Sequence, residues 1–290
     1  MKPFEFIKAE TTEDAIAALA EHGPDIRILA GGTDLLVDLK HAGASPGVVL
    51  DISRVDDLSA ISLADDGLHI GAAVTHTEIM DDPLIEEHAP AMIDAAHTVG
   101  AVQTRNLGTI GGNLVTCVPS MDSGPVLMAL EAEVTLAGSG GRRRMKLTEF
   151  FVGPRKTILA TDELLLEIVI PTENLGKPAH FLKFGLRKGQ ALALVNVASS
   201  LWLEDGKITA PRIALGAVAP VVIRCEGAEA ALEGQAVSDQ VIAEAAKIAA
   251  GEARPIDDFR ASKEYRMDLI EVGVRRTLAA AIELAGQEGE

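Results

Sequence analysis

Hydrophobic and polar positions along the first 55 residues predict a small α/β unit. Short apolar runs at 4–7, 26–30 and 48–52 are typical of strands. After the first run, Thr12 is suited to cap a helix with apolar residues at three- and four-residue spacing, and Gly23-Pro24 ends that helix. Residues 35–40 predict a short helical turn. The expected order is therefore strand, helix, strand, loop, strand.

A second unit is expected from about residue 57 to 171. Strands near Ile61 and at 68–74 are joined by the turn Asp65-Asp66-Gly67, and a helix starts at Thr77. Further helices follow Pro90 and Asp122, the first closed by Gly100. The glycine-rich turn at 138–141 predicts a hairpin between 133–136 and 142–147, and 164–170 predicts one more strand, stopped by Pro171.

The segment 171–179 is polar and contains two prolines and a glycine, so it predicts a linker between domains. Beyond it, runs at 181–186, 194–203 and 208–218 predict an antiparallel sheet, with Asp205-Gly206 as a hairpin turn. The remainder is helical from about Val237, and its last helix covers 264–284. The expected domains are therefore 1–171, with subdomains at about 1–56 and 57–171, and 179–288.

Composition narrows the function. The net charge of −17 argues against a nucleic-acid partner, since phosphate binding needs clustered Lys and Arg. The only two cysteines, Cys117 and Cys225, provide neither a zinc nor an iron–sulfur ligand set. We assign no metal site, and we expect a cytoplasmic protein, because no signal-peptide pattern and no apolar run of about 18 residues is present.

Two Gly-Gly segments are the candidate chemistry. Gly31-Gly32 directly follows a predicted buried strand, and Gly111-Gly112 lies in a similar context. Such turns aim several backbone N–H groups at one point, which suits an anion. Two of them fit a ligand with two phosphates, although two ordinary tight turns are the alternative. Neither segment is a Rossmann or P-loop motif.

These residues carry a resemblance. The stretches 30–36 (AGGTDLL) and 109–113 (TIGGN) resemble the two flavin-binding loops of the FAD-binding medium subunits of molybdenum hydroxylases, the carbon monoxide dehydrogenase and xanthine dehydrogenase family. The segments 105–108 (RNLG), 162–165 (DELL) and 183–188 (KFGLRK) also fall in family order, so the similarity covers nearly the whole chain.

The resemblance implies an α+β fold: a two-subdomain FAD-binding α/β domain of the vanillyl-alcohol-oxidase (PCMH) type, then a C-terminal domain with a three-stranded antiparallel sheet and helices. It also implies that both loops wrap the pyrophosphate and adjacent sugar, that Asp122 and Leu165 lie near the flavin, and that Lys183 lies near its ring. The implied FAD-binding residues are Ala30, Gly31, Gly32, Thr33, Asp34, Leu35, Leu36, Thr109, Ile110, Gly111, Gly112, Asn113, Asp122, Leu165 and Lys183. No residue is implied to be catalytic.

Simpler interpretations remain for several of these residues. Asp122 is also a good helix N-cap, Leu165 suits a plain core position, Lys183 suits a solvated strand edge, and Asp34 is able to stabilise its own turn. Two departures from the family pattern bear on the flavin ring. Residues 191–193 read Ala-Leu-Ala where the family often has a carboxylate, and 118–121 read Val-Pro-Ser-Met where a Ser-Pro pair is common.

The resemblance implies an electron-transfer subunit of a larger oxidoreductase. A large partner holds the molybdenum cofactor, a small partner holds [2Fe–2S] clusters, and FAD on this chain passes electrons to an external acceptor. A dimer of heterotrimers is the expected assembly. Two alternatives stay open: a stand-alone FAD-dependent oxidase or reductase of the same fold, and a cofactor-free assembly subunit.

Overall fold

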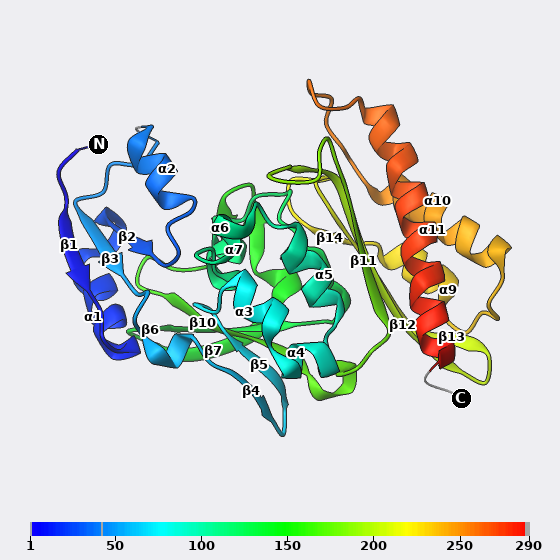
Figure 1. Ribbon diagram of the computed structural model, residues 1–290, viewed down its shortest axis with the longest axis horizontal. Helices are drawn as coiled ribbons and strands as arrows, with labels where there is room; N and C mark the ends of the chain where they lie inside the picture. The colour runs from blue at the N-terminus through cyan, green and yellow to red at the C-terminus, as the bar shows by residue number, and fades with distance from the viewer. Residues whose placement is uncertain (1, 42, 288–290) are drawn as a thin grey trace.

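The computed structural model describes residues 2–41 and 43–287. Two α/β lobes and a C-terminal domain follow one another along the long axis of the molecule, from the blue N-terminal end to the orange and red helices (Figure 1). The expected α+β architecture is confirmed, with one difference in the C-terminal sheet that is described below.

The first lobe is a three-stranded parallel sheet in the order β1-β3-β2. Its elements are β1 (Glu5–Lys8), α1 (Thr12–His22), β2 (Ile26–Leu29), α2 (Leu35–Lys40) and β3 (Val48–Asp51). Helix α1 begins one residue earlier than expected, because Thr11 forms a capping box with Asp14. Ala15 and Leu19 of this helix pack on Leu50 in the core of the lobe.

The second lobe is built on a five-stranded antiparallel sheet in the order β4-β5-β10-β6-β7. Its strands are β4 (Ile61–Ala64), β5 (Gly67–Gly71), β6 (Glu133–Gly138), β7 (Gly141–Lys146) and β10 (Leu164–Pro171), and β8 (Phe151–Gly153) pairs with β9 (Lys156–Thr157). Its helices are α3 (His76–Asp81), α4 (Pro83–His88), α5 (Ala91–Thr98), α6 (Val102–Arg105), α7 (Ile110–Thr116) and α8 (Ser123–Ala129). Short 3-10 turns occupy Gly23–Asp25, Asp56–Leu58, Leu147–Glu149 and Thr172–Asn174.

Several helix ends of this lobe differ from the sequence expectation. Helix α3 starts at His76 because Thr75, not Thr77, accepts from Glu78 N in a capping box. Pro90 is the N-cap of α5 rather than its first residue, and Val99 rather than Gly100 is the C-cap. The second Gly-Gly segment lies in the first turn of α7, so it is not an isolated turn.

The C-terminal domain has a four-stranded antiparallel sheet in the order β11-β12-β13-β14, where three strands were expected. The extra strand β14 has two residues, and α9 follows it without any strong sequence signal. The elements are β11 (Ala179–Gly185), β12 (Ala193–Glu204), β13 (Lys207–Gly216), β14 (Ile223–Arg224), α9 (Glu226–Leu232), α10 (Asp239–Glu252) and α11 (Lys263–Gln287). Asp205 and Gly206 both have positive φ (50° and 74°), as the expected hairpin turn requires.

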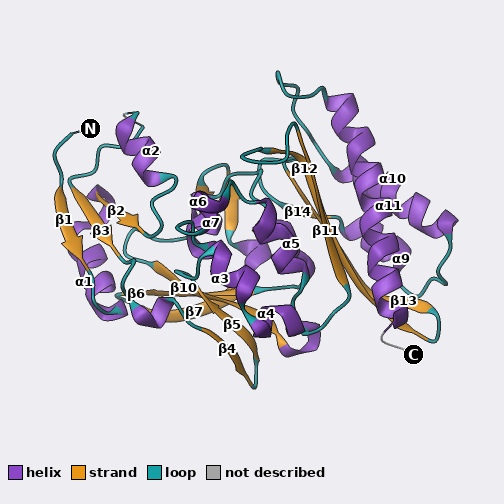
Figure 2. Ribbon diagram, in the orientation of Figure 1, coloured by secondary structure: helices purple, strands orange, loops and turns teal. Residues whose placement is uncertain are grey.

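Helices separate the two antiparallel sheets. Figure 2 shows α5 between the sheet of the second lobe and the C-terminal sheet, and α10 and α11 on the outer face of the latter. One core cluster includes Leu127 of α8 together with Phe181 and Ala198 of the C-terminal sheet. The second lobe is therefore continuous in its packing with the C-terminal domain.

The connecting segment 172–178 begins with exposed residues at 172–173 and ends with buried ones at 177–178. Lys177 is only 2% exposed and its Nζ donates to Asn174 Oδ1 at 3.2 Å. Burial lowers the pKa of Lys177 to about 8, and the nearby Arg212 guanidinium adds to this shift. No helix within the described residues is long and apolar enough to cross a membrane.

Candidate functional site

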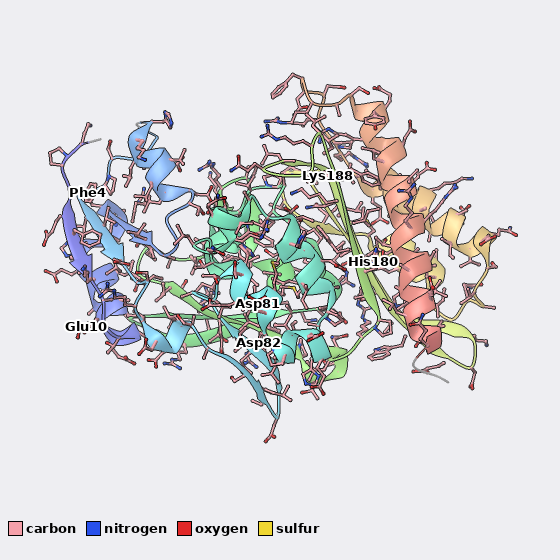
Figure 3. All side chains as sticks on the ribbon, in the orientation of Figure 1. Phe4, Glu10, Asp81, Asp82, His180 and Lys188 are labelled. Atoms are coloured by element: carbon pink, nitrogen blue, oxygen red, sulfur yellow. The ribbon has the colours of Figure 1, made fainter. Side chains whose placement is uncertain are left out.

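A cleft of about 440 Å³ opens between the first and second lobes. The loop from β2 to α2, the start of α7, the segment before α8 and strand β10 all contribute to its lining, as does the loop between β11 and β12. Both Gly-Gly segments therefore meet at one site, although about 80 residues separate them in sequence. Lys188, labelled in Figure 3, marks the exposed β11–β12 loop whose residues 190–192 line the cleft.

The first Gly-Gly segment leaves backbone donors free. Within residues 2–41 and 43–287, no hydrogen-bond acceptor is found for the N–H groups of Gly31, Gly32, Thr33 and Asp34. Gly32 has φ +71°, the left-handed region that favours glycine. At Gly31, a Cβ would lie 1.7 Å from Leu107 O, so only glycine permits the contact with the loop before α7. Because its donors have no internal partner, this segment is suited to hold an anion.

The second Gly-Gly segment differs in this respect. The N–H groups of Ile110 and Gly111 donate to Val74 O and Ala72 O, both at 2.9 Å. Gly112 N donates to Thr109 Oγ1 at 3.1 Å, so Thr109 caps its own helix. A Cβ on Gly111 would lie 2.5 Å from Ala72 O. The expectation that both segments offer several free N–H donors thus holds for the first alone; the second brings α7 close to β5.

Asp34 connects the two segments. Its side chain makes no cap contact with α2; instead Oδ2 accepts from Thr116 Oγ1 at 3.3 Å, across from α7. Arg155 of the second lobe also contacts the first lobe, where it donates to Asp38 Oδ2 at 3.0 Å. The interpretation of Asp34 as a residue that stabilises only its own turn is therefore wrong.

Asp122 is the centre of a buried polar cluster beside the cleft. Lys183 Nζ donates to Asp122 Oδ2 at 2.5 Å and Asn196 Nδ2 donates to Oδ1 at 2.9 Å. Although Asp122 precedes α8, its side chain makes no capping hydrogen bond. Burial raises the pKa of Asp122, and the Lys183 ammonium and Asn196 amide oppose this shift. Asp122 does occupy the N-cap position of α8, but its carboxylate is held by two residues of the C-terminal domain, so capping does not account for this side chain.

Most of the expected site residues line the cleft. Leu165, 2% exposed, does so at a bulge in β10, where strands are often redirected next to functional sites. Leu36 and Ile110 are not among the lining residues: the Leu36 side chain packs beside Gly32, and Ile110 is core. Lys183 lies behind Asp122 with a side chain 9% exposed, so it is not a solvated strand residue. The expected residues that line the cleft are Ala30, Gly31, Gly32, Thr33, Asp34, Leu35, Thr109, Gly111, Gly112, Asn113, Asp122 and Leu165.

Other lining residues carried no clear sequence signal. His76 and Thr104 contribute from α3 and α6, and Gln190 to Leu192 contribute from the β11–β12 loop. Ala191 brings no carboxylate to the cleft, and Ser120 brings a hydroxyl. Thr75 pairs with Thr109 in an isolated bridge, which places His76, the first residue of α3, beside the second Gly-Gly segment at the start of α7. Only this pairing reveals His76 as part of the site.

The cleft combines an anion loop, hydroxyls and apolar walls. Free N–H groups suit phosphate oxygens, an Asp34 carboxylate suits hydroxyl donors such as those of a sugar, and the apolar side chains of Leu159, Leu164 and Leu165 suit a flat ring. These features define a protein with two α/β lobes and a cleft that is suited to an elongated ligand with an anionic middle. The donor set fits a dinucleotide.

Comparisons with known proteins agree with this class. A family described as "FAD binding domain in molybdopterin dehydrogenase" matches residues 2–173, and "CO dehydrogenase flavoprotein C-terminal domain" matches residues 180–281. The xanthine dehydrogenase FAD-binding subunit of Escherichia coli O157:H7 is 32% identical over 283 residues, 96% of each chain. The carbon monoxide dehydrogenase medium chain of Hydrogenophaga pseudoflava is 31% identical over 278 residues, again 96% of each.

A solved structure is similar throughout. It is carbon monoxide dehydrogenase from Hydrogenophaga pseudoflava in a form lacking the Mo-pyranopterin moiety of its cofactor, with a TM-score of 0.94 and 31% identity over 98% of this chain and 99% of that one. The chain therefore belongs to the family of FAD-binding medium subunits of molybdenum hydroxylases. It is an FAD-carrying oxidoreductase subunit, and its relatives are single subunits of multi-subunit dehydrogenases.

Proposed function

We propose that the cleft holds FAD with the diphosphate at the two Gly-Gly segments and the flavin ring toward Asp122 and Leu165. The observation that carries this assignment is the set of N–H groups at Gly31 to Asp34, which line the cleft and have no acceptor within the described residues, because several backbone donors converging on one loop suit an anion. The spacing of the two polar ends supports the same orientation. The anion loop belongs to the first lobe, whereas Asp122 sits where the second lobe meets the C-terminal domain.

Each residue then has a distinct task. The N–H groups of the first loop donate to phosphate oxygens, and Asp34 accepts from a sugar hydroxyl. Asp122 accepts from an N–H at the flavin end, and Lys183 positions Asp122 and supplies positive charge from behind it. Leu165 excludes water from that end. FAD, when bound, supplies the electron transfer, and the chain supplies binding and electrostatics.

We propose that this subunit works between two partners and an acceptor. A small subunit with [2Fe–2S] clusters delivers electrons, a large subunit with a molybdenum cofactor hydroxylates the primary substrate, and an external acceptor takes the electrons from FAD. Assembly as a dimer of heterotrimers completes the proposal. Support comes from the relatives, which are medium chains of carbon monoxide and xanthine dehydrogenases. Both cysteines are free and buried, which fits the reducing cytoplasm.

A stand-alone oxidase is the weaker reading. Such an enzyme requires a general base poised over the flavin ring. Among the described residues that line the cleft, the titratable groups are Asp34, Asp122 and His76; Asp122 is held by Lys183, and Asp34 and His76 belong to the anion-loop end. No observation favours this alternative.

Purification of the full chain tests the proposal. We expect a yellow protein that retains about one FAD per chain, and that co-purifies from its native source with a large molybdenum protein and a small iron–sulfur protein. A colourless chain that takes up no added FAD would refute the cofactor assignment. An active single-chain oxidase would instead establish the alternative.

A further inference from the structure

We propose that His76 is a ligand of the diphosphate: its imidazole Nε2–H donates to a phosphate oxygen at the point where the two Gly-Gly segments meet. This inference rests on the proposed function, since it names a further binding residue of the same site. It is carried by three observations: an unpartnered buried ring, the direction of its Nε2 edge, and the lack of cations in the lining.

The His76 ring is buried without a hydrogen bond. The residue is 2% exposed, and its Nδ1 is enclosed without a partner. Nε2 is not enclosed in this way, and no hydrogen bond to it is found within residues 2–41 and 43–287. The enclosed Nδ1 is closed to a ligand, so Nε2 is the ring nitrogen left for one that enters the cleft. Because His76 lines the cleft, the cleft is the route by which a partner reaches the ring.

The ring edge formed by Cδ2 and Nε2 lies beside Gly108, in the segment that leads into α7. His76 N donates to Gly108 O at 3.0 Å, so helix α3 begins directly beside the segment that leads into α7. A Cβ placed on Gly108 would lie 3.6 Å from His76 Cδ2 and 3.5 Å from Thr33 Oγ1. Cδ2 is bonded to Nε2. The imidazole edge of the second lobe and the Thr33 hydroxyl of the first lobe therefore lie near the same glycine, so one phosphate beside Gly108 would be within reach of both.

The lining of the cleft provides no positive charge to balance a diphosphate, so a neutral N–H donor such as His76 is useful there. Among the described lining residues none is Lys or Arg, whereas Asp34 and Asp122 both contribute a carboxylate. A diphosphate in this cleft must therefore be compensated by N–H and O–H dipoles. The second Gly-Gly segment has already used the N–H groups of Ile110, Gly111 and Gly112. A neutral imidazole N–H on the α7 side replaces the donors that this segment does not offer.

The protonation state agrees with a donor role. Burial lowers the pKa of His76 to about 4, and the Arg105 charge adds to this, so the ring is neutral near pH 7. A neutral imidazole has one N–H. With Nδ1 enclosed and Nε2 toward the cleft, an N–H on Nε2 serves a ligand. In the FAD-free chain the ring contributes no hydrogen bond to stability.

A ligand role and a purely structural role of His76 predict different effects of a substitution on stability and on FAD affinity. His76→Leu removes the donor and keeps an apolar side chain of similar size. It should leave the thermal midpoint of the FAD-free full chain unchanged or raise it, because replacing an unpaired buried polar group is nearly neutral or stabilising. The same variant should weaken FAD binding about 10- to 100-fold, the range of a hydrogen bond to a charged group.

The experiment measures Kd for FAD and for ADP on the FAD-free full chain, by titration and by competition. His76→Gln keeps an amide N–H donor and should recover part of the loss. His97→Leu, an exposed histidine on α5 of the same lobe, is the matched control and should bind as the wild type does. ADP carries the diphosphate without the flavin, so His76→Leu should weaken ADP and FAD by similar factors.

Three results overturn the inference. Unchanged FAD affinity in His76→Leu shows that the ring is not a ligand. A loss confined to FAD, with ADP unaffected, places His76 at the flavin half instead. If the thermal midpoint of FAD-free His76→Leu falls far enough to account for the whole loss of affinity, then His76 has a packing role instead. If the wild-type chain binds no FAD at all, the proposed function fails first, and this outcome is separate from the other three.

Discussion

The Asp122–Lys183 pair gives the sharpest test of how the domains are held over the cleft. Asp122 belongs to the second lobe and Lys183 to the C-terminal sheet, and their side chains are 6% and 9% exposed. Lys183→Met keeps the length of the side chain and removes the charge. It leaves the Asp122 carboxylate buried without a cation beside it, and an uncompensated buried charge costs about 3–5 kcal/mol.

That cost is large enough to measure directly. At about 2–4 °C per kcal/mol, the thermal midpoint should fall by about 6–20 °C. Asp122→Asn alone should also destabilise the chain, because it strands the ammonium. The double variant Asp122→Asn/Lys183→Met has no stranded charge, so its cost should be smaller than the sum of the two single costs. Lys247→Met, at an exposed position on α10, is the control and should change stability little.

The pH dependence supplies a second readout. Burial raises the pKa of Asp122, and without Lys183 nothing cationic opposes the shift. A carboxyl whose pKa is higher in the folded than in the unfolded chain binds more protons when folded, so stability falls as pH rises through the folded pKa. The deficit of Lys183→Met should therefore be smaller at pH 5 than at pH 8. Thermal or urea unfolding of the FAD-free chain at both values tests this. Single costs that add in the double variant, or a deficit independent of pH, would refute the reasoning.

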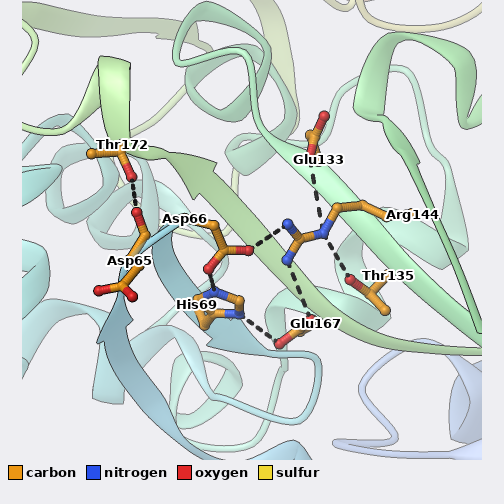
Figure 4. Close-up of polar contacts among 8 residues, drawn as sticks. All are labelled: Asp65, Asp66, His69, Glu133, Thr135, Arg144, Glu167 and Thr172. Carbon is orange, nitrogen blue, oxygen red and sulfur yellow. Dashed lines mark hydrogen bonds and ion pairs between the residues drawn. The ribbon is translucent and has the colours of Figure 1, made fainter.

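Two further predictions follow from the geometry. Gly31→Ala should destabilise the chain by about 1–3 kcal/mol and lower its flavin content, because the new Cβ lies 1.7 Å from Leu107 O and the loop must move; Gly140→Ala, with nothing within 4 Å, is the control for both measurements. His69 contacts Asp66 and Glu167, each at 2.9 Å (Figure 4). Burial alone would lower the pKa of His69, but hydrogen bonds to Glu167 and Asp66 raise it above 6.5. The stabilisation that protonated His69 gives the folded chain is therefore present below pH 6.5 and is lost as pH rises through the pKa of the folded state. His69→Gln should thus lower the thermal midpoint at pH 5.5, by the equivalent of less than about 1 kcal/mol, and have no effect at pH 9; an equal effect at both values would contradict this.

The sequence by itself determined the local elements and the two loops. The first lobe was predictable because each of its strands is a short apolar run and its helix has a clear end at Gly23. Helix α2 runs from Leu35 to Lys40 as expected. The turn at Asp205-Gly206 was predictable for the same reason, since it depends on the φ angles that two adjacent residues accept. Features of this kind are decided within a few residues of the chain.

Tertiary structure decided what the polar groups do. Asp122 is a plausible N-cap in any sequence reading, and only a lysine 61 residues away makes it half of an ion pair. The two Gly-Gly segments look alike in sequence, yet the donors of the second are used because the segment that follows β5 runs beside the start of α7. His76 enters the site through the pairing of Thr75 with Thr109. Whether a donor is free depends on which acceptor packs against it, and that partner comes from elsewhere in the chain.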